Sequence, residues 1–115
     1  MTVTGSVESV DPERVLKRAP VGIEADGARR FGRPTAATLL LTADELVIVS
    51  GPDEAPQVVM RQGRCDLAMV RRPTPRGGER VELAALDGQQ TTLRFARGHA
   101  PAAGVLASWL AGLPV

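Results

Sequence analysis

Short runs of leucine and β-branched residues, each ended by a glycine, a proline or a polar turn, occupy much of this 115-residue chain. The clearest pair is ATLLL at 37–41 and ELVIVS at 45–50, which only the turn TAD separates. Runs this short are typical of strands, although Thr42 and Glu45 also have the spacing of a helix capping box. We therefore expect a β-hairpin here, within a fold made of many short strands.

Turn residues separate five further runs that have the composition of strands. They lie at 21–25, 57–61, 65–72, 79–86 and 90–96. Asp87-Gly88 before the last run is a strong hairpin signal, and alternation in the third run places Cys65, Leu67 and Met69 on its inward face. Strands joined by such short turns pair with their chain neighbours, which predicts an antiparallel meander.

The last segment changes to the helical period. Pro101 suits a first helical turn, and apolar residues recur after it at spacings of three and four. These residues are Ala102, Val105, Leu106, Trp109 and Leu113, with Gly112 and Pro114 ending the helix. Because aromatic residues are only 3% of the chain, we expect its one tryptophan to be a large part of the core. Val105, Leu106, Trp109 and Leu113 are the predicted capping residues.

These patterns predict a mainly β fold with one C-terminal α-helix. The strands form either two small sheets or one strongly bent sheet, and the helix closes the open end of this barrel or sandwich. Residues 1–10 are expected to be a flexible arm or a weak edge strand, and 11–115 a single domain. Asp11 followed by Pro12 favours one or two helical turns before the first strand.

A seven-stranded antiparallel meander closed by a helix with a central tryptophan resembles the pleckstrin-homology (PH) superfold, and most closely its GRAM-type and bacterial PH-like domains. TLLLTADELVIVS at 38–50 is similar to a hairpin of that family. DGQQTTLRF followed by GVLASWLAGL is similar to its last strand pair and capping helix. The resemblance covers residues 14–113. RRP, Glu79 and SWL also resemble the soluble part of a small actinobacterial family of membrane-anchored proteins.

Composition bears on the compartment and on the class of partner. The net charge of +1 lacks the basic field of a nucleic-acid-binding domain, so no nucleic-acid partner is expected. Cys65 is the only cysteine, which excludes an internal disulfide and a cysteine-based metal cluster and suits a reducing compartment. No signal-peptide pattern opens the sequence, and its longest apolar run is too short to span a bilayer. The expected location is the cytoplasm.

The sequence contains no strong catalytic signature. His99 is the only histidine, and at its place before Pro101 a capping or exposed imidazole is expected rather than a general base. No nucleophile–base set, P-loop, dinucleotide fingerprint or metal-ligand spacing occurs. We therefore predict that the chain is not an enzyme and that it needs no cofactor or metal.

A Gly-rich segment, ADGARRFGRP, holds the first of two arginine clusters, Arg29, Arg30 and Arg33. Guanidinium groups bind phosphate through paired hydrogen bonds, and neighbouring glycines let a ligand approach the backbone. The PH resemblance implies that these arginines lie in the first hairpin loop, where many lipid-binding members hold phosphoinositide headgroups. The alternative is a solvated loop.

The second cluster surrounds the turn PTPRGG and consists of Arg71, Arg72, Arg76 and Arg80. Charges in such a turn ordinarily keep it soluble. Arg71 and Arg72 become candidate anion ligands if the two clusters open at the same end of the barrel.

The sequence therefore predicts a small non-enzymatic binding or scaffolding module that engages a protein partner or forms a homo-oligomer. QVVMR at 57–61 has few charges and suits an edge strand to which a peptide or a second copy adds. The alternative is a binder of an anionic lipid headgroup or phosphate ligand through Arg29, Arg30 and Arg33. That alternative places the protein at the periphery of an anionic membrane surface.

Overall fold

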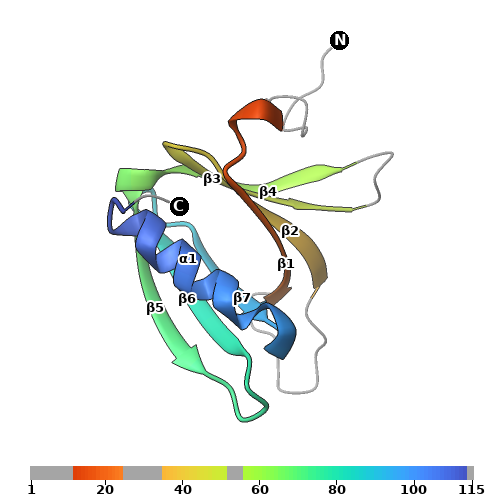
Figure 1. The fold of residues 1–115 in the computed structure, drawn as a ribbon. Helices are drawn as coiled ribbons and strands as arrows, with labels where there is room; N and C mark the ends of the chain where they lie inside the picture. Colours follow the sequence, from red (N-terminus) through yellow and green to blue (C-terminus); the bar gives the residue numbers. More distant parts are fainter. Residues whose placement is uncertain (1–11, 25–34, 52–55, 114–115) are drawn as a thin grey trace.

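One seven-stranded antiparallel sheet and one C-terminal helix make up the fold in the computed structural model, which describes residues 12–24, 35–51 and 56–113 (Figure 1). The strands are β1 (Lys17–Glu24), β2 (Thr35–Leu41), β3 (Glu45–Ser50), β4 (Gln57–Gly63), β5 (Leu67–Pro73), β6 (Glu79–Ala85) and β7 (Gln90–Phe95). The helix is α1 (Ala100–Leu110), and short 3₁₀ turns are η2 (Pro12–Arg14), η3 (Arg64–Asp66) and η4 (Arg97–His99). The predicted fold class is confirmed.

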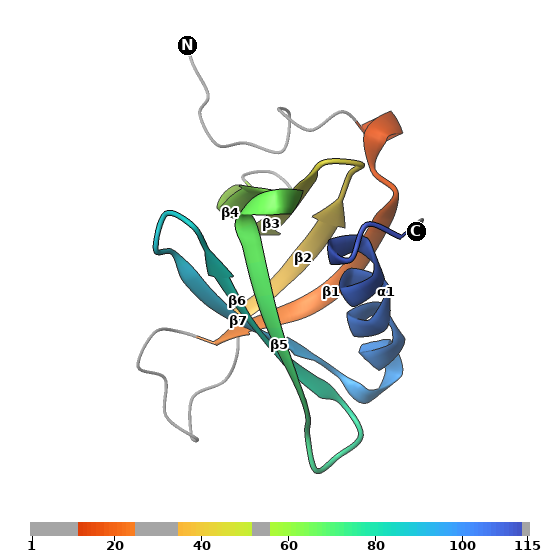
Figure 2. The same cartoon turned by 90° about the vertical axis from the view of Figure 1, so that its left-hand side faces the viewer.

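The strands follow the order β4-β3-β2-β1-β7-β6-β5 in a single sheet, so the two-sheet alternative is wrong. The sheet bends around α1 and stays open between β4 and β5, which are its two edges (Figures 1 and 2). An open, strongly bent sheet leaves an apolar interior that only another element can cover, and α1 supplies that cover.

The TAD turn closes the β2–β3 hairpin as predicted. The Thr42 backbone N–H donates to the Glu45 carbonyl oxygen at 2.9 Å, and the Glu45 N–H donates to Thr42 Oγ1 at 3.0 Å. The residues with capping-box spacing therefore form a tight turn between strands, because the apolar residues on both sides alternate between the two faces of the sheet.

Two local expectations are corrected. The predicted strand at 65–72 begins later, because the chain makes the 3₁₀ turn η3 at the corner between β4 and β5. Cys65 lies in that turn and is exposed rather than inward-facing. Of the one or two helical turns expected after Asp11, the structure contains one, the 3₁₀ turn η2 that begins at Pro12, and the expected arm at 1–10 lies outside the described residues.

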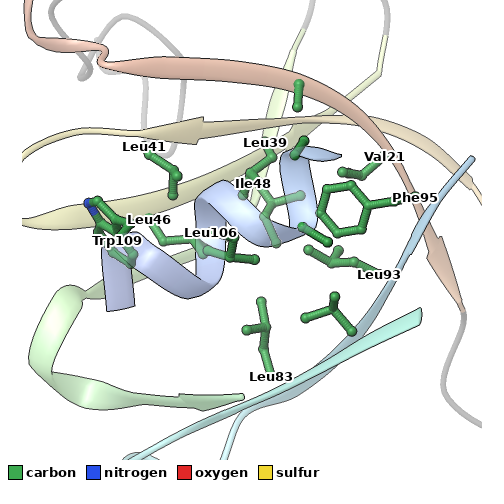
Figure 3. Close-up of a cluster of buried hydrophobic side chains, with 14 of the residues drawn as sticks. Val21, Leu39, Leu41, Leu46, Ile48, Leu83, Leu93, Phe95, Leu106 and Trp109 are labelled. Carbon is green, nitrogen blue, oxygen red and sulfur yellow. The ribbon is translucent and has the colours of Figure 1, made fainter. Parts of the chain in front are cut away.

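Every strand but β5 contributes at least one buried side chain to the core that surrounds α1 (Figure 3). Its fully buried members are Leu39, Leu41, Leu46, Ile48, Met60, Val81, Leu83, Leu93, Phe95, Ala103, Leu106 and Trp109. Leu67 and Met69 of β5 are partly buried against this cluster. The period of two in the strands and the stripe on α1 therefore point into one interior.

Trp109 is fully buried near the C-terminal end of α1. Its indole Nε1 donates a 2.6 Å hydrogen bond to the Thr42 carbonyl oxygen in the β2–β3 turn. Leu106 is also fully buried, and Val105 is partly buried against the same core. Leu113 departs from the predicted stripe, because α1 ends at Leu110 and the chain turns away, which leaves Leu113 54% exposed.

The outer face of the sheet, which points away from α1, differs between its two halves. Over β2, β3 and β4 it carries a small apolar cluster in which Leu40, Val47 and Val49 are buried. Val15, from the segment before β1, packs against this cluster. Over β1, β7, β6 and β5 the outer face is charged, and the candidate site lies there.

Candidate anion-binding face

Three arginines stand directly opposite one another on neighbouring strands of the outer face. Arg72 on β5 pairs with Arg80 on β6, and Arg80 pairs with Arg94 on β7. Gly22 on β1 continues the same line beyond Arg94. Because Val81 and Leu93 beside them point into the core, strand alternation directs these three side chains outward. We call Arg72, Arg80 and Arg94 the arginine row.

Two glutamates lie two residues along the strands from the arginine row, on the same face of the sheet. Glu24 at the end of β1 accepts from Arg94 Nε at 2.8 Å through Oε2 and from Arg80 Nη2 at 3.0 Å through Oε1. Glu82 Oε2 lies 3.8 Å from Arg80 Nη1 and 3.9 Å from Arg72 Nε. Each carboxylate is shared by two arginines, so three positive charges face two negative ones.

The arginine row keeps much of its surface open to solvent. The side chains of Arg72, Arg94 and Arg80 are 64%, 50% and 41% exposed. The 3.9 Å approach to Glu82 is too long for a hydrogen bond. Among the described residues Arg72 therefore keeps its guanidinium donors available, whereas Arg80 Nε is buried without a hydrogen-bond partner.

Like charges directly opposite one another on paired strands destabilise a sheet. The fold nonetheless holds three arginines in that arrangement, and two shared carboxylates offset it only in part. An added anion would relieve the remaining repulsion. The three outward arginines, with two carboxylates among them, make this face a candidate anion site.

Arg71 does not belong to the arginine row. It pairs across the ladder with Val81, so it stands on the α1 side of the sheet. Its Nε donates to Glu79 Oε2 at 2.8 Å, and its Nη2 donates to the other carboxylate oxygen. The structure therefore does not bring Arg71 and Arg72 together, because the two side chains lie on opposite faces of the sheet and Arg71 is paired with Glu79.

The paired hydrogen bonds of Arg71 lower the pKa of Glu79 from its ordinary value and raise that of Arg71. A carboxyl whose pKa is lower in the folded state stabilises the fold above its unfolded pKa, and loses that contribution as the pH falls through its folded pKa.

Replacing Glu79 by glutamine is therefore expected to lower the free energy of unfolding at pH 7 by only about 0.5–1 kcal/mol, since the pair is partly solvent-screened. The difference from wild type should be full above the ordinary glutamate pKa of about 4.3 and should shrink as the pH falls through the lower pKa of folded Glu79. Urea unfolding of both proteins at pH 7 and pH 3 measures it. In an Arg71→Met background the substitution should have no pH-dependent effect, and an equal loss at both pH values would contradict the assignment.

Arg29, Arg30 and Arg33 lie outside the described residues, so their proposed role stays a prediction. The segment that carries them follows Glu24 directly in the chain, and Glu24 is the carboxylate that Arg80 and Arg94 share. Arg76 is exposed in the β5–β6 turn.

Arg94, Glu24 and Glu82 are site residues that sequence reasoning missed. The alternation in β7 does show that Arg94 faces away from Leu93 and Phe95. Its placement beside Arg80 depends on the register between β6 and β7, which no single run of sequence contains.

His99 is the exposed N-cap residue of α1 and makes no side-chain capping hydrogen bond. Among the described residues, no group of three or more histidine, cysteine, aspartate or glutamate side chains is arranged to hold a metal ion. None of the helices in that part of the chain has the length and apolarity needed to cross a membrane.

Comparison with solved structures identifies the fold. The chain is similar to the PH domain of Slm1, whose crystal structure contains phosphoserine, with a TM-score of 0.58 over 87% of this chain and 92% of that chain. The sequences are 13% identical, so the likeness concerns the fold alone. No protein-family model matches the sequence, and the search of curated proteins gives no match. The chain has a PH-like fold.

Proposed function

We propose that this chain is a binding module that recognises a phosphate-bearing ligand through the arginine row. The observation that carries the proposal is the placement of Arg72, Arg80 and Arg94 at directly opposite positions on three strands, with two carboxylates between them. The resemblance to GRAM-type and bacterial PH-like domains belongs to the same proposal, which includes no catalytic step.

The chemistry of the arginine row suits phosphate. A guanidinium presents five N–H donors in a planar fork, and phosphate offers several acceptor oxygens with a charge near −2. Arg72 is the most exposed member and its guanidinium has no hydrogen bond among the described residues, so it is the expected first contact. Arg94 keeps its two Nη groups beyond the Nε bond to Glu24. That the structurally similar Slm1 domain was crystallised with phosphoserine supports the same ligand class.

A phosphate group reaches a protein either on a lipid headgroup or on another molecule. Arg29, Arg30 and Arg33 extend the proposal to a membrane surface, because their segment adjoins Glu24 in the sequence. Binding at such a surface is the peripheral location that the sequence analysis gives as its alternative. Titration with O-phospho-L-serine and with vesicles of phosphatidylcholine, alone or with an anionic phosphoinositide, separates the two sources.

The double variant Arg72→Ala/Arg94→Ala is expected to weaken O-phospho-L-serine binding at least about tenfold, since each hydrogen bond to a charged group contributes about 1.5–3 kcal/mol. Isothermal titration calorimetry measures the change. Arg76→Ala/Arg97→Ala removes the same charge from two exposed residues outside the arginine row and should leave the affinity within about twofold. An equal loss in both double variants would show a general charge effect and contradict the site.

A further inference from the structure

The sheet has two edges, and they differ in how far they are already covered. The register between β3 and β4 shifts between Ile48 and Val49, which marks a β-bulge on the β4 side. Gln89 Nε2, from the β6–β7 turn, also donates to the Val59 carbonyl oxygen at 3.2 Å. Bulges and covering groups are the usual means by which an edge strand is kept from pairing. The edge predicted at 57–61 is therefore the protected one.

In the part of the chain that the structure describes, the β5 edge carries neither protection. Figure 1 shows β5 at the margin of the sheet, with α1 on its inner side, and among the described strands it pairs with β6 alone. Its side chains are exposed from Val70 to Pro73. Met69 faces the core and is partly buried against it, which holds the strand in place. The backbone edge of β5 that faces away from β6 stays open among the described residues.

Hydrogen bonds at the two ends of the β5–β6 ladder determine which backbone groups point outward. The Leu86 N–H donates to Asp66 O at 2.9 Å, and the Thr74 N–H donates to Gly78 O at 3.0 Å. In an antiparallel ladder such bonded pairs recur at every second residue. Even-numbered residues of β5 therefore bond to β6.

The odd-numbered residues Leu67, Met69 and Arg71 direct both N–H and C=O to the open side. No hydrogen bond among the described residues occupies these groups. Pro73 has the same orientation. An edge strand accepts proline at such a position, because the missing N–H would face solvent and not the neighbouring strand.

A strand added at this edge would lie in register with the arginine row. Residues directly opposite one another on paired strands point to the same face, with Cβ atoms about 4.5–5.5 Å apart. The residue opposite Arg72 would therefore extend the line Arg72–Arg80–Arg94 by one position. On the added strand, the side chain two residues further along would also point outward and would lie opposite Val70. Val70 is apolar and 48% exposed.

We infer that the ligand of the proposed phosphate site is an extended peptide that pairs with β5 and places a phosphorylated side chain opposite Arg72. This inference rests on the proposed function and adds the kind of partner and its register. Backbone pairing at Leu67, Met69 and Arg71 supplies affinity, and the arginine row supplies charge specificity. A β-branched residue two positions from the phosphorylated one suits contact with Val70.

Charge complementarity favours this partner over a second copy of the chain. Antiparallel pairing of β5 with the β5 of another copy puts both arginine rows on one continuous outer face. Like charges brought together in that way oppose association. A phosphorylated strand brings charge of the opposite sign to the same place.

The test is an array of nine-residue peptides with a central phosphoserine and varied flanks, each beside its unphosphorylated twin. The tightest peptide is then titrated by fluorescence anisotropy against wild type, Met69→Pro and Met69→Leu, with O-phospho-L-serine as competitor. Proline removes an outward N–H that β6 does not use, and leucine keeps both that N–H and the packing.

We expect the best phosphopeptide to bind at least tenfold more tightly than free O-phospho-L-serine. Met69→Pro should remove that advantage without changing phosphoserine affinity, and Met69→Leu should retain it. In wild type, peptide binding should slow amide hydrogen exchange at Leu67, Met69 and Arg71 but change it little at Ala68 and Val70. The exchange pattern decides the question if Met69→Pro fails to fold.

Four results would overturn the inference. If phosphoserine binds but no phosphopeptide binds more tightly, or if only phosphoinositide vesicles bind, the peptide partner is wrong and the phosphate site remains. If the unphosphorylated twins bind equally well, the role of the arginine row in peptide recognition is wrong. If phosphoserine, the phosphopeptides and the phosphoinositide vesicles all fail to bind, the proposed function falls together with the inference.

Discussion

Replacing Trp109 by alanine is expected to lower the free energy of unfolding by about 3–5 kcal/mol, the usual cost of emptying a large aromatic site in a core. The indole is fully buried between the end of α1 and the β2–β3 turn, and it packs in the same cluster as Leu41, Leu46 and Leu106 (Figure 3). Domains of this size are ordinarily stable by about 5–15 kcal/mol, so the variant should be marginally folded. Urea unfolding followed by far-UV circular dichroism measures the loss.

Trp109→Phe is the control that separates volume from hydrogen bonding. It keeps an aromatic ring in the core but removes the Nε1 donor to the Thr42 carbonyl oxygen. A smaller loss of about 1–3 kcal/mol is expected, since a buried carbonyl oxygen is left without its partner and part of the volume is empty. If Trp109→Ala unfolds at the same urea concentration as wild type, α1 does not close the sheet.

Strand alternation predicts the fold well where both sides of a strand are paired. The run at 45–50 coincides with β3, because its inward and outward residues are both buried and its ends are fixed by the Thr42 turn and Gly51. The strand expected to begin after Pro20 instead begins at Lys17. β7 pairs with β1 only from Gly22 onward, so Pro20 has no β7 partner and the strand continues through it.

The candidate site could be predicted only in fragments. Arg72 and Arg80 stand out as a cluster in the sequence, but their cluster also includes Arg71, which alternation places on the other face. Arg94 comes from a strand that the sequence separates from them, and it joins the row through the register of β6 with β7. Register depends on turn geometry and on the match of whole strands, so local patterns leave it open.

At the end of α1, the sequence pattern predicts more structure than the fold contains. A helical stripe extended to Leu113 predicts one more buried residue than the fold holds, because the helix stops after Leu110. A side chain far away in the sequence fixes that end. Arg64 in η3 donates from Nη2 to the Leu113 carbonyl oxygen at 3.2 Å and from Nε to that of Trp109.

Replacing Arg64 by methionine is therefore expected to lower the free energy of unfolding by about 2–3 kcal/mol, the cost of losing several hydrogen bonds from one charged group. Besides its bonds to the end of α1, Nη1 donates to the Ala43 carbonyl oxygen at 2.8 Å, and Cζ lies 5.2 Å from the centre of the Trp109 ring. One guanidinium thus joins the β2–β3 turn, the β4–β5 corner and the helix C-terminus, whose partial negative charge favours a cation.

Methionine keeps most of the aliphatic stem of Arg64, so the measured loss reports the guanidinium rather than packing. Arg64→Lys retains the charge without the planar fork and should recover only part of the stability. Because Arg64 contacts Trp109 directly, a double-mutant cycle with Trp109→Phe should give a coupling energy of about 0.5–3 kcal/mol. A loss no larger than that of Arg76→Met, at an exposed arginine, would show that Arg64 does not hold the helix to the sheet.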